Sequence, residues 1–85
     1  MAKGIYTRIY TDIHQRISIT RHALLQAQER NIGDADHIED LIRTARVVRF
    51  GKNHAKFISH NGVTCIAEIT TTDIIVITVE RGNTP

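Results

Sequence analysis

The feature that most constrains the fold is the pair Asn61-Gly62, which stands between two runs of strand-forming residues. A two-residue type I′ hairpin needs positive φ at both central positions, and asparagine and glycine tolerate that conformation better than other residues. The pair therefore predicts a tight β-hairpin. The cross-strand pairs expected from a two-residue turn, all on one face of the sheet, are His60 with Val63, Ile58 with Cys65, and Lys56 with Ala67.

Two helices are expected before this hairpin. The first spans residues 20–31 and ends at Asn31, which is suited to the left-handed conformation of a residue that follows a helix. The second spans residues 34–45, has the clearest helical periodicity in the chain, and begins at Asp34, whose carboxylate can accept a hydrogen bond from a free backbone amide. Because the connection between them is short, the two form a helical hairpin that packs on one face of a sheet.

Runs rich in β-branched residues follow the helices. The expected strands cover residues 46–50, 55–60, 63–69 and 74–80. Their short connections imply antiparallel neighbours. The predicted fold class is therefore α+β, with the helical hairpin packed on one face of a three- to four-stranded antiparallel sheet.

Residues 1–17 form an additional N-terminal segment. Isoleucine recurs there at every fourth position from Ile5 to Ile17, which slightly favours an amphipathic helix, although the same stretch is also rich in strand-forming residues. In either conformation its apolar stripe is expected to pack on the rest of the domain or on a second subunit, so a homodimer through residues 5–17 is one expectation. The remaining organisation is a single domain over residues 18–81 and a frayed tail over residues 82–85.

Composition limits the classes of function. Of the 85 residues, 41% are hydrophobic, and no apolar run approaches the length of about 18 residues that a membrane-spanning helix needs. The first residues lack the apolar segment of a secretory signal, and the single cysteine, Cys65, offers no intramolecular disulfide. A cytoplasmic protein with no membrane partner is the resulting expectation.

Charge is distributed unevenly along the chain. Five cations and no carboxylate fall between Arg43 and Lys56, shortly after five carboxylates between Glu29 and Asp40. The basic block could attract a phosphate backbone, or it could form a solvated face that matches the helix dipole. The residues that the first interpretation assigns to RNA binding are Arg46, Arg49, Lys52 and His60.

Five histidines suggest a metal site, but their spacing argues against one. No two of them stand four residues apart on a helix, and Cys65 has no second thiol to join it. Cys65 lies among apolar residues, which favours a buried, inert thiol over a nucleophile. The sequence therefore predicts no metal and no cofactor.

Metal-free RNA cleavage is the chemistry that the remaining residues could supply. Removal of the ribose 2′-proton needs a base, the leaving 5′-oxygen needs an acid, and the charge that grows on the phosphoryl oxygens needs cations. The alternative is that the candidate side chains pack locally, pair with carboxylates or face solvent. The candidates are His22, Arg30, Lys56 and His60.

Three short motifs follow one another along the expected helices and the last strand: Ile19-Thr20-Arg21-His22-Ala23, Glu29-Arg30-Asn31-Ile32 and Ile77-Thr78-Val79. Over about residues 18–81 they resemble a family of small bacterial domains of unknown function, whose layout is similar to that of the RelE-type and BrnT-type toxin ribonucleases. The resemblance implies a RelE-like fold and a metal-independent endoribonuclease that acts through 2′-OH attack. It also implies a toxin of a toxin–antitoxin, phage-borne or plasmid-borne system, with RNA and a cognate antitoxin as partners. The catalytic residues that it implies are His22, Arg30, Lys56 and Thr78.

Two positions depart from the family pattern. Gln26 stands where family members often have an arginine, and Glu80 stands where they often have a tyrosine. If the family's active site uses those positions, the same scaffold serves here without catalysis. The alternative function is therefore a non-catalytic RNA- or protein-binding module, such as an inhibitor or regulator.

Overall fold

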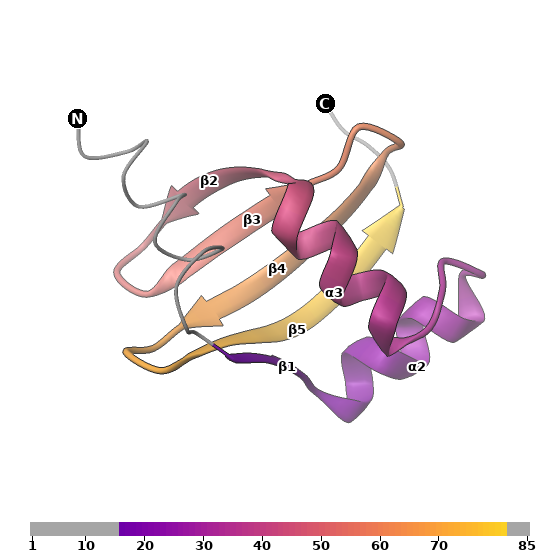
Figure 1. Ribbon diagram of the computed structural model, residues 1–85, viewed down its shortest axis with the longest axis horizontal. Coiled ribbons are helices and arrows are strands. Elements are labelled where there is room, and N and C mark those ends of the chain that lie inside the picture. The colour runs from indigo at the N-terminus through magenta and orange to yellow at the C-terminus, as the bar shows by residue number, and fades with distance from the viewer. Residues whose placement is uncertain (1–15, 82–85) are drawn as a thin grey trace.

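The computed structural model describes residues 16–81, which fold into two helices and one five-stranded sheet. The elements in chain order are β1 (Arg16–Ile19), α2 (Arg21–Glu29), α3 (Ala35–Thr44), β2 (Arg46–Phe50), β3 (His54–Ile58), β4 (Val63–Ile69) and β5 (Asp73–Arg81). The strands lie in the order β1-β5-β4-β3-β2. Both helices lie on the same face of this sheet (Figure 1). No helix within the described range is long and apolar enough to span a membrane.

The predicted α+β class is confirmed, but the sheet differs from the prediction. It has five strands, and it is mixed because β1 is parallel to β5 while the other neighbouring pairs are antiparallel. β1 crosses the predicted boundary between the N-terminal segment and the domain, which lies between residues 17 and 18. Residues 16 and 17 thus belong to a strand, and the helix slightly favoured for them is wrong. The side chains of this strand alternate, since Ile17 and Ile19 pack against the core whereas Arg16 and Ser18 bind Asp73. Residues 1–15, and with them most of the segment expected to form a homodimer, lie outside the described residues.

Side-chain and backbone hydrogen bonds fix the ends of the helices. Thr20 and Asp34 cap α2 and α3, each with a side-chain oxygen that accepts from the amide three residues ahead, at 3.1 and 3.0 Å. Asn31 adopts the predicted left-handed conformation, with φ 56°. This lets the amide of Ile32 donate to the carbonyl of Ala27 at 2.8 Å and folds the chain back toward α3.

The hairpin between β3 and β4 has a longer loop than predicted, and the predicted register is wrong by one residue. Ile58 pairs with Thr64 instead of Cys65, so three residues form the loop. Gly62 has φ 89°, but Asn61 does not adopt positive φ, and a type I′ turn needs both. A slip of one residue exchanges the two faces of a strand. Here it sends Cys65 to the core and the charged side chains of β3 and β4 to the opposite face.

A β-bulge in β5 brings the strand back to the core near its end. Ile77 has no partner in β4, because Val76 and Thr78 pair with consecutive residues of that strand. The extra residue allows Val79 to face the core, where it is fully buried. The amide of Val79 donates to Gln26 Oε1 at 3.0 Å, which ties α2 to the sheet. Gln26 therefore has a structural role at the position where the resemblance expects an arginine.

The core lies between the helices and one face of the sheet. Alternate residues of β4 are buried, and the residues between them are half-buried. The largest fully buried side chains come from β3, β5 and α3: Phe57, Ile74, Val76, Val79, Ile38 and Ile42. The helices thus protect one face of the sheet only.

The other face, which we call the open face, is covered by no element within residues 16–81. β2 and β3 contribute Arg46, Val48, Phe50, His54, Lys56 and Ile58 to it. β4 and β5 contribute Thr64, Ile66, Glu68, Ile75, Thr78 and Glu80, and the β1 edge of the face carries Asp73, Arg16 and Ser18. Its side chains remain half-buried or exposed because only their cross-strand neighbours shield them.

We expect Ile42→Ala to lower the free energy of unfolding by about 2–5 kcal/mol, because it removes buried methyl groups and leaves a cavity under α3. Urea denaturation followed by circular dichroism measures the change. Leu25→Ala is the control, because Leu25 on α2 is 48% exposed. An Ile42→Ala curve that overlays the wild-type curve would show that α3 does not pack on the sheet.

Candidate functional site

The residues assigned to catalysis divide between two sides of the molecule. His22 and Arg30 are exposed on α2, the helix whose alanines pack on the core face. Lys56 and Thr78 lie on the open face, where both are cross-strand neighbours of Ile66. The structure therefore brings Lys56 and Thr78 into one row and separates them from His22 and Arg30.

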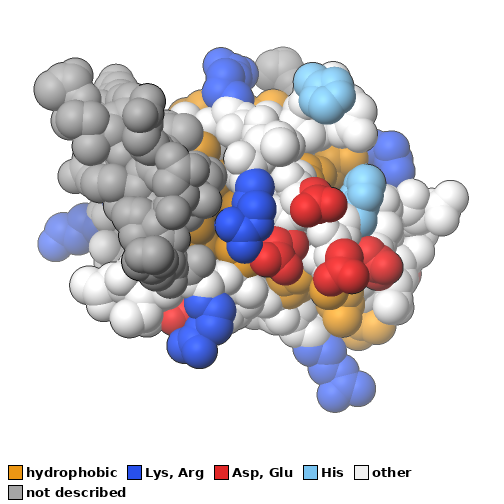
Figure 2. Space-filling view, viewed as in Figure 1, with side chains coloured by type: hydrophobic (Ala, Val, Ile, Leu, Met, Phe, Trp, Pro, Cys, Tyr) orange, Lys and Arg blue, Asp and Glu red, His pale blue; other side chains and the backbone are white. Residues whose placement is uncertain are grey.

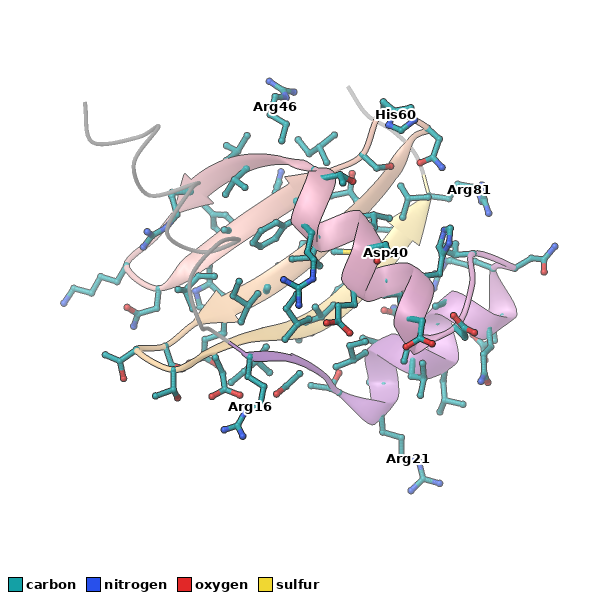
Figure 3. The ribbon with its side chains drawn as sticks, in the orientation of Figure 1. Arg16, Arg21, Asp40, Arg46, His60 and Arg81 are labelled. Atoms are coloured by element: carbon teal, nitrogen blue, oxygen red, sulfur yellow. The ribbon has the colours of Figure 1, made fainter. Side chains whose placement is uncertain are left out.

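The residues assigned to RNA binding are also dispersed. Arg46 is exposed on the open face, whereas Arg49 pairs with the buried Ala55 and lies on the core side of β2, where its guanidinium donates to the carbonyl of Lys52 at 3.1 Å. Lys52 and His60 lie in the turns at opposite ends of β3. Arg46 and His60 lie near one border of the domain (Figure 3). The basic block of the sequence thus does not form one continuous basic surface.

The surface of α3 carries mostly negative charge. Carboxylates gather over α3 in the space-filling view (Figure 2). One cation of the basic block, Arg43, is paired there with Glu39 at 2.6 Å. This face consequently offers little attraction to a phosphate backbone.

The open face carries several apolar side chains among its charges. Cross-strand pairing arranges its side chains in three rows that run across β2, β3, β4 and β5. The rows are Arg46–Ile58–Thr64–Glu80, Val48–Lys56–Ile66–Thr78 and Phe50–His54–Glu68–Ile75. Val48 and Phe50 are 40% and 41% exposed, values that are high for large hydrophobic residues, and Phe50 stacks on His54 with ring centroids 5.6 Å apart. The open face therefore combines exposed apolar area with an aromatic pair at the β2 edge.

The charges of the open face separate into two halves. Arg46 and Lys56 lie on β2 and β3, and Glu68 and Glu80 lie on β4 and β5. Within residues 16–81, the two other charges on this side of the sheet, Arg16 and Asp73 at the β1 edge, pair with each other. This surface is not among the sites predicted from the sequence, since it depends on the strand order and on the observed register of the hairpin. The signal that could have found it is the alternation of charged and buried residues along β3 and β4.

At the β1 edge, Asp73 holds the parallel strand in place. Arg16 Nε donates to its carboxylate at 3.2 Å and Ser18 Oγ at 2.9 Å. Hydrogen bonds donated by Thr72, Arg16 and Ser18 lower the pKa of Asp73 to about 2. This carboxylate is therefore a structural anion and not a proton donor at neutral pH.

Cys65 is buried, as the sequence predicts. Burial raises the pKa of its thiol to about 12, so the thiolate that a nucleophile requires does not form at neutral pH. Within residues 16–81, no group of three or more histidine, cysteine or acidic side chains is arranged to hold a metal ion. Neither thiol chemistry nor a metal centre is thus built from the described residues.

A hollow of about 420 Å³ lies between α3 and the β3–β4 turn. Its walls include two histidines, His37 and His60, together with Asp40 and Arg43. His37 is not among the site residues predicted from the sequence, because nothing in its local sequence indicates that α3 places it beside the β3–β4 turn. The hollow is an open depression beside the acidic surface of α3, a less favourable setting for an anionic substrate than a basic cleft.

Comparison with known protein families, curated proteins and solved structures finds no match for this chain. The resemblance to RelE-like domains therefore stays a prediction that rests on three short motifs. The functional argument depends on the geometry and chemistry of the described residues.

The ionised form of Asp73 should stabilise the fold, because its pKa of about 2 in the folded protein is below the value of about 3.9 expected for the unfolded chain. This stabilisation is present above about pH 4 and is lost as the pH falls toward about 2. Asp73→Asn should therefore melt at a lower temperature than the wild type at neutral pH, and the two melting temperatures should approach each other in acid. Thermal denaturation across this range measures the difference. A difference that does not change with pH would contradict the assignment.

Proposed function

We propose that this protein is a non-catalytic module that binds another protein through the open face of its sheet. The observation that supports this most is the composition of that face, where the apolar side chains Val48, Phe50, Ile58, Ile66 and Ile75 lie among charges of both signs. Protein interfaces combine an apolar centre with a polar rim, and exposed apolar patches mark such sites. Val48, Phe50 and Ile66 would form the apolar part of the contact.

The balance of charge favours a protein over RNA as the partner. RNA-binding surfaces need an excess of cations, because much of their affinity comes from contacts to phosphates. On the open face Arg46 and Lys56 are matched by Glu68 and Glu80. The other side carries the carboxylates of α3 (Figure 2). Among the described residues, neither the open face nor the surface of α3 has the excess of cations that favours binding to an RNA backbone.

The separation of the expected catalytic residues also favours binding over catalysis. A base and a cation must contact the same phosphodiester within hydrogen-bond distance. His22 lies on a helix of the core side, whereas Lys56 lies on the open face. This separation supports a binding role over cleavage by His22 and Lys56 acting on one phosphate.

A RelE-like, metal-independent ribonuclease is the second candidate, and one observation favours it. His54 lies on the open face, two positions from Lys56 and directly across from Glu68. An imidazole beside a carboxylate can transfer protons at neutral pH, and a nearby lysine can stabilise a phosphorane. In this candidate, His54 takes the role that the sequence suggests for His22, and a cognate antitoxin would cover the open face.

Site-specific photo-crosslinking tests the first candidate. A benzophenone amino acid at position 48 on the open face should yield covalent adducts with protein in the native host. The same amino acid at Leu25, an equally exposed apolar position on α2, is the matched control and should yield none. The adducts should disappear when Ile66→Glu is added, because a carboxylate at the centre of the face would be costly to bury. Absence of protein adducts from position 48, or equal adducts from position 25, would contradict the proposal.

An RNA assay distinguishes the two candidates. Purified protein incubated with total RNA and with tRNA, without divalent metal, should leave both intact. Cleavage that persists in His22→Ala but falls by about a hundredfold or more in His54→Ala would instead support the ribonuclease. Cleavage that is the same in both variants would indicate a contaminating nuclease.

A further inference from the structure

We propose that the protein bound by the open face is a second copy of this chain, packed face to face about a two-fold axis. This inference rests on the proposed function, because it names the partner of the same surface. The observation that carries it is the division of the open face into a basic half on β2 and β3 and an acidic half on β4 and β5. In a two-fold dimer each surface must complement itself.

One placement of the axis pairs the halves. If the axis runs parallel to the strands between β3 and β4, then β2 lies over β5 of the second copy and β3 lies over its β4. Each row of side chains then faces the same row in reverse order. Arg46 lies opposite Glu80 of the second copy, and His54 lies opposite Glu68 of the second copy.

The apolar side chains match in the same arrangement. Phe50 lies opposite Ile75 of the second copy, and Lys56 lies opposite Ile66 of the second copy. The aliphatic part of the Lys56 side chain can pack on Ile66 of the second copy. Its ammonium can then extend to the carboxylate of Glu68 in the neighbouring row. No like charges face each other in any of the three rows.

Other placements of the axis oppose like charges. An axis that runs along β4 places Glu68 opposite Glu68 of the second copy. An axis perpendicular to the strands, through the centre of the face, places Lys56 opposite Lys56 of the second copy. Like-charge contacts in a partly buried interface are costly, so the axis between β3 and β4 is favoured.

Pairing of two β2 edges is a poorer alternative. β2 carries Arg46 and Arg49 within five residues, so an edge-to-edge contact would bring four guanidinium groups together. Positive charge on an edge strand is a common means of preventing such pairing. The open face, with its balanced charge, is the better surface for association.

The size of the face sets the expected affinity. Four strands at a spacing of about 4.8 Å, with five residues each at about 3.4 Å, give a surface about 20 Å on a side. Such a face is smaller than the surface of about 800 Å² per partner that a standard interface buries. We therefore expect a dimer that dissociates in the micromolar range.

Sedimentation velocity of the full chain over about 1 to 500 µM measures this equilibrium. The wild type should change from monomer to dimer with concentration, and Ile66→Glu should weaken the dimer by about a hundredfold or more. Leu25→Glu, an exposed apolar position on α2, should leave it unchanged. Val48→Asp replaces Ile66→Glu if circular dichroism shows that the latter is unfolded. A wild type that is monomeric throughout would overturn the inference.

Charge reversal tests the position of the axis. Arg46→Glu and Glu80→Arg should each weaken the dimer about tenfold or more, because each places like charges opposite one another. The double variant should restore the dimer, because positions 46 and 80 then again carry opposite charges across the interface. Arg21→Glu is the control, since Arg21 on α2 lies at the opposite border of the domain from Arg46 (Figure 3). Single variants without effect, or a double variant that is not restored, would overturn this arrangement.

The outcomes separate this inference from the proposed function. A crosslink from position 48 to a second copy supports both. A crosslink to a different protein, from a chain that is monomeric at all concentrations, overturns the second-copy partner and leaves the binding module intact. A monomer that yields no protein adduct overturns both.

Discussion

The alternation of side chains along β4 decides which face of the sheet the helices bury. Val63, Cys65, Ala67 and Ile69 all point to one side. Ala23 and Ala27 of α2 are fully buried on the same side. The caps of the helices, the bulge of β5 and the bond between Gln26 and Val79 all serve this one-sided packing. The residues between them on β4 necessarily form the opposite surface.

That opposite surface is the open face, through which we propose that the protein binds its partner. A sheet whose second face only meets water commonly carries threonine and charged residues there. Here Ile66 and Ile75 occupy central positions, and Val48 and Phe50 extend the apolar area to the β2 edge. These residues add nothing to the core between the sheet and the helices. Under the function that we propose, a bound partner covers them.

Local signals in the sequence predict most of the fold. The caps at Thr20 and Asp34 and the left-handed Asn31 are encoded within a few residues, and they define both helices. β1 could not be predicted in this way, because four residues of alternating polarity are stabilised by pairing with a strand far along the chain. The register of the central hairpin depended on the φ angle of Asn61, which the sequence does not specify.

The pairing of β1 with β5 also bears on the order of folding. Arg16 and Asp73 are 57 residues apart, whereas the strands from β2 to β5 are joined by short loops. Closing a long loop costs more entropy than closing a hairpin, and proteins rich in such distant contacts fold slowly. The antiparallel sheet from β2 to β5 can thus assemble first. β1, the first of the described strands in the chain, then joins the sheet last.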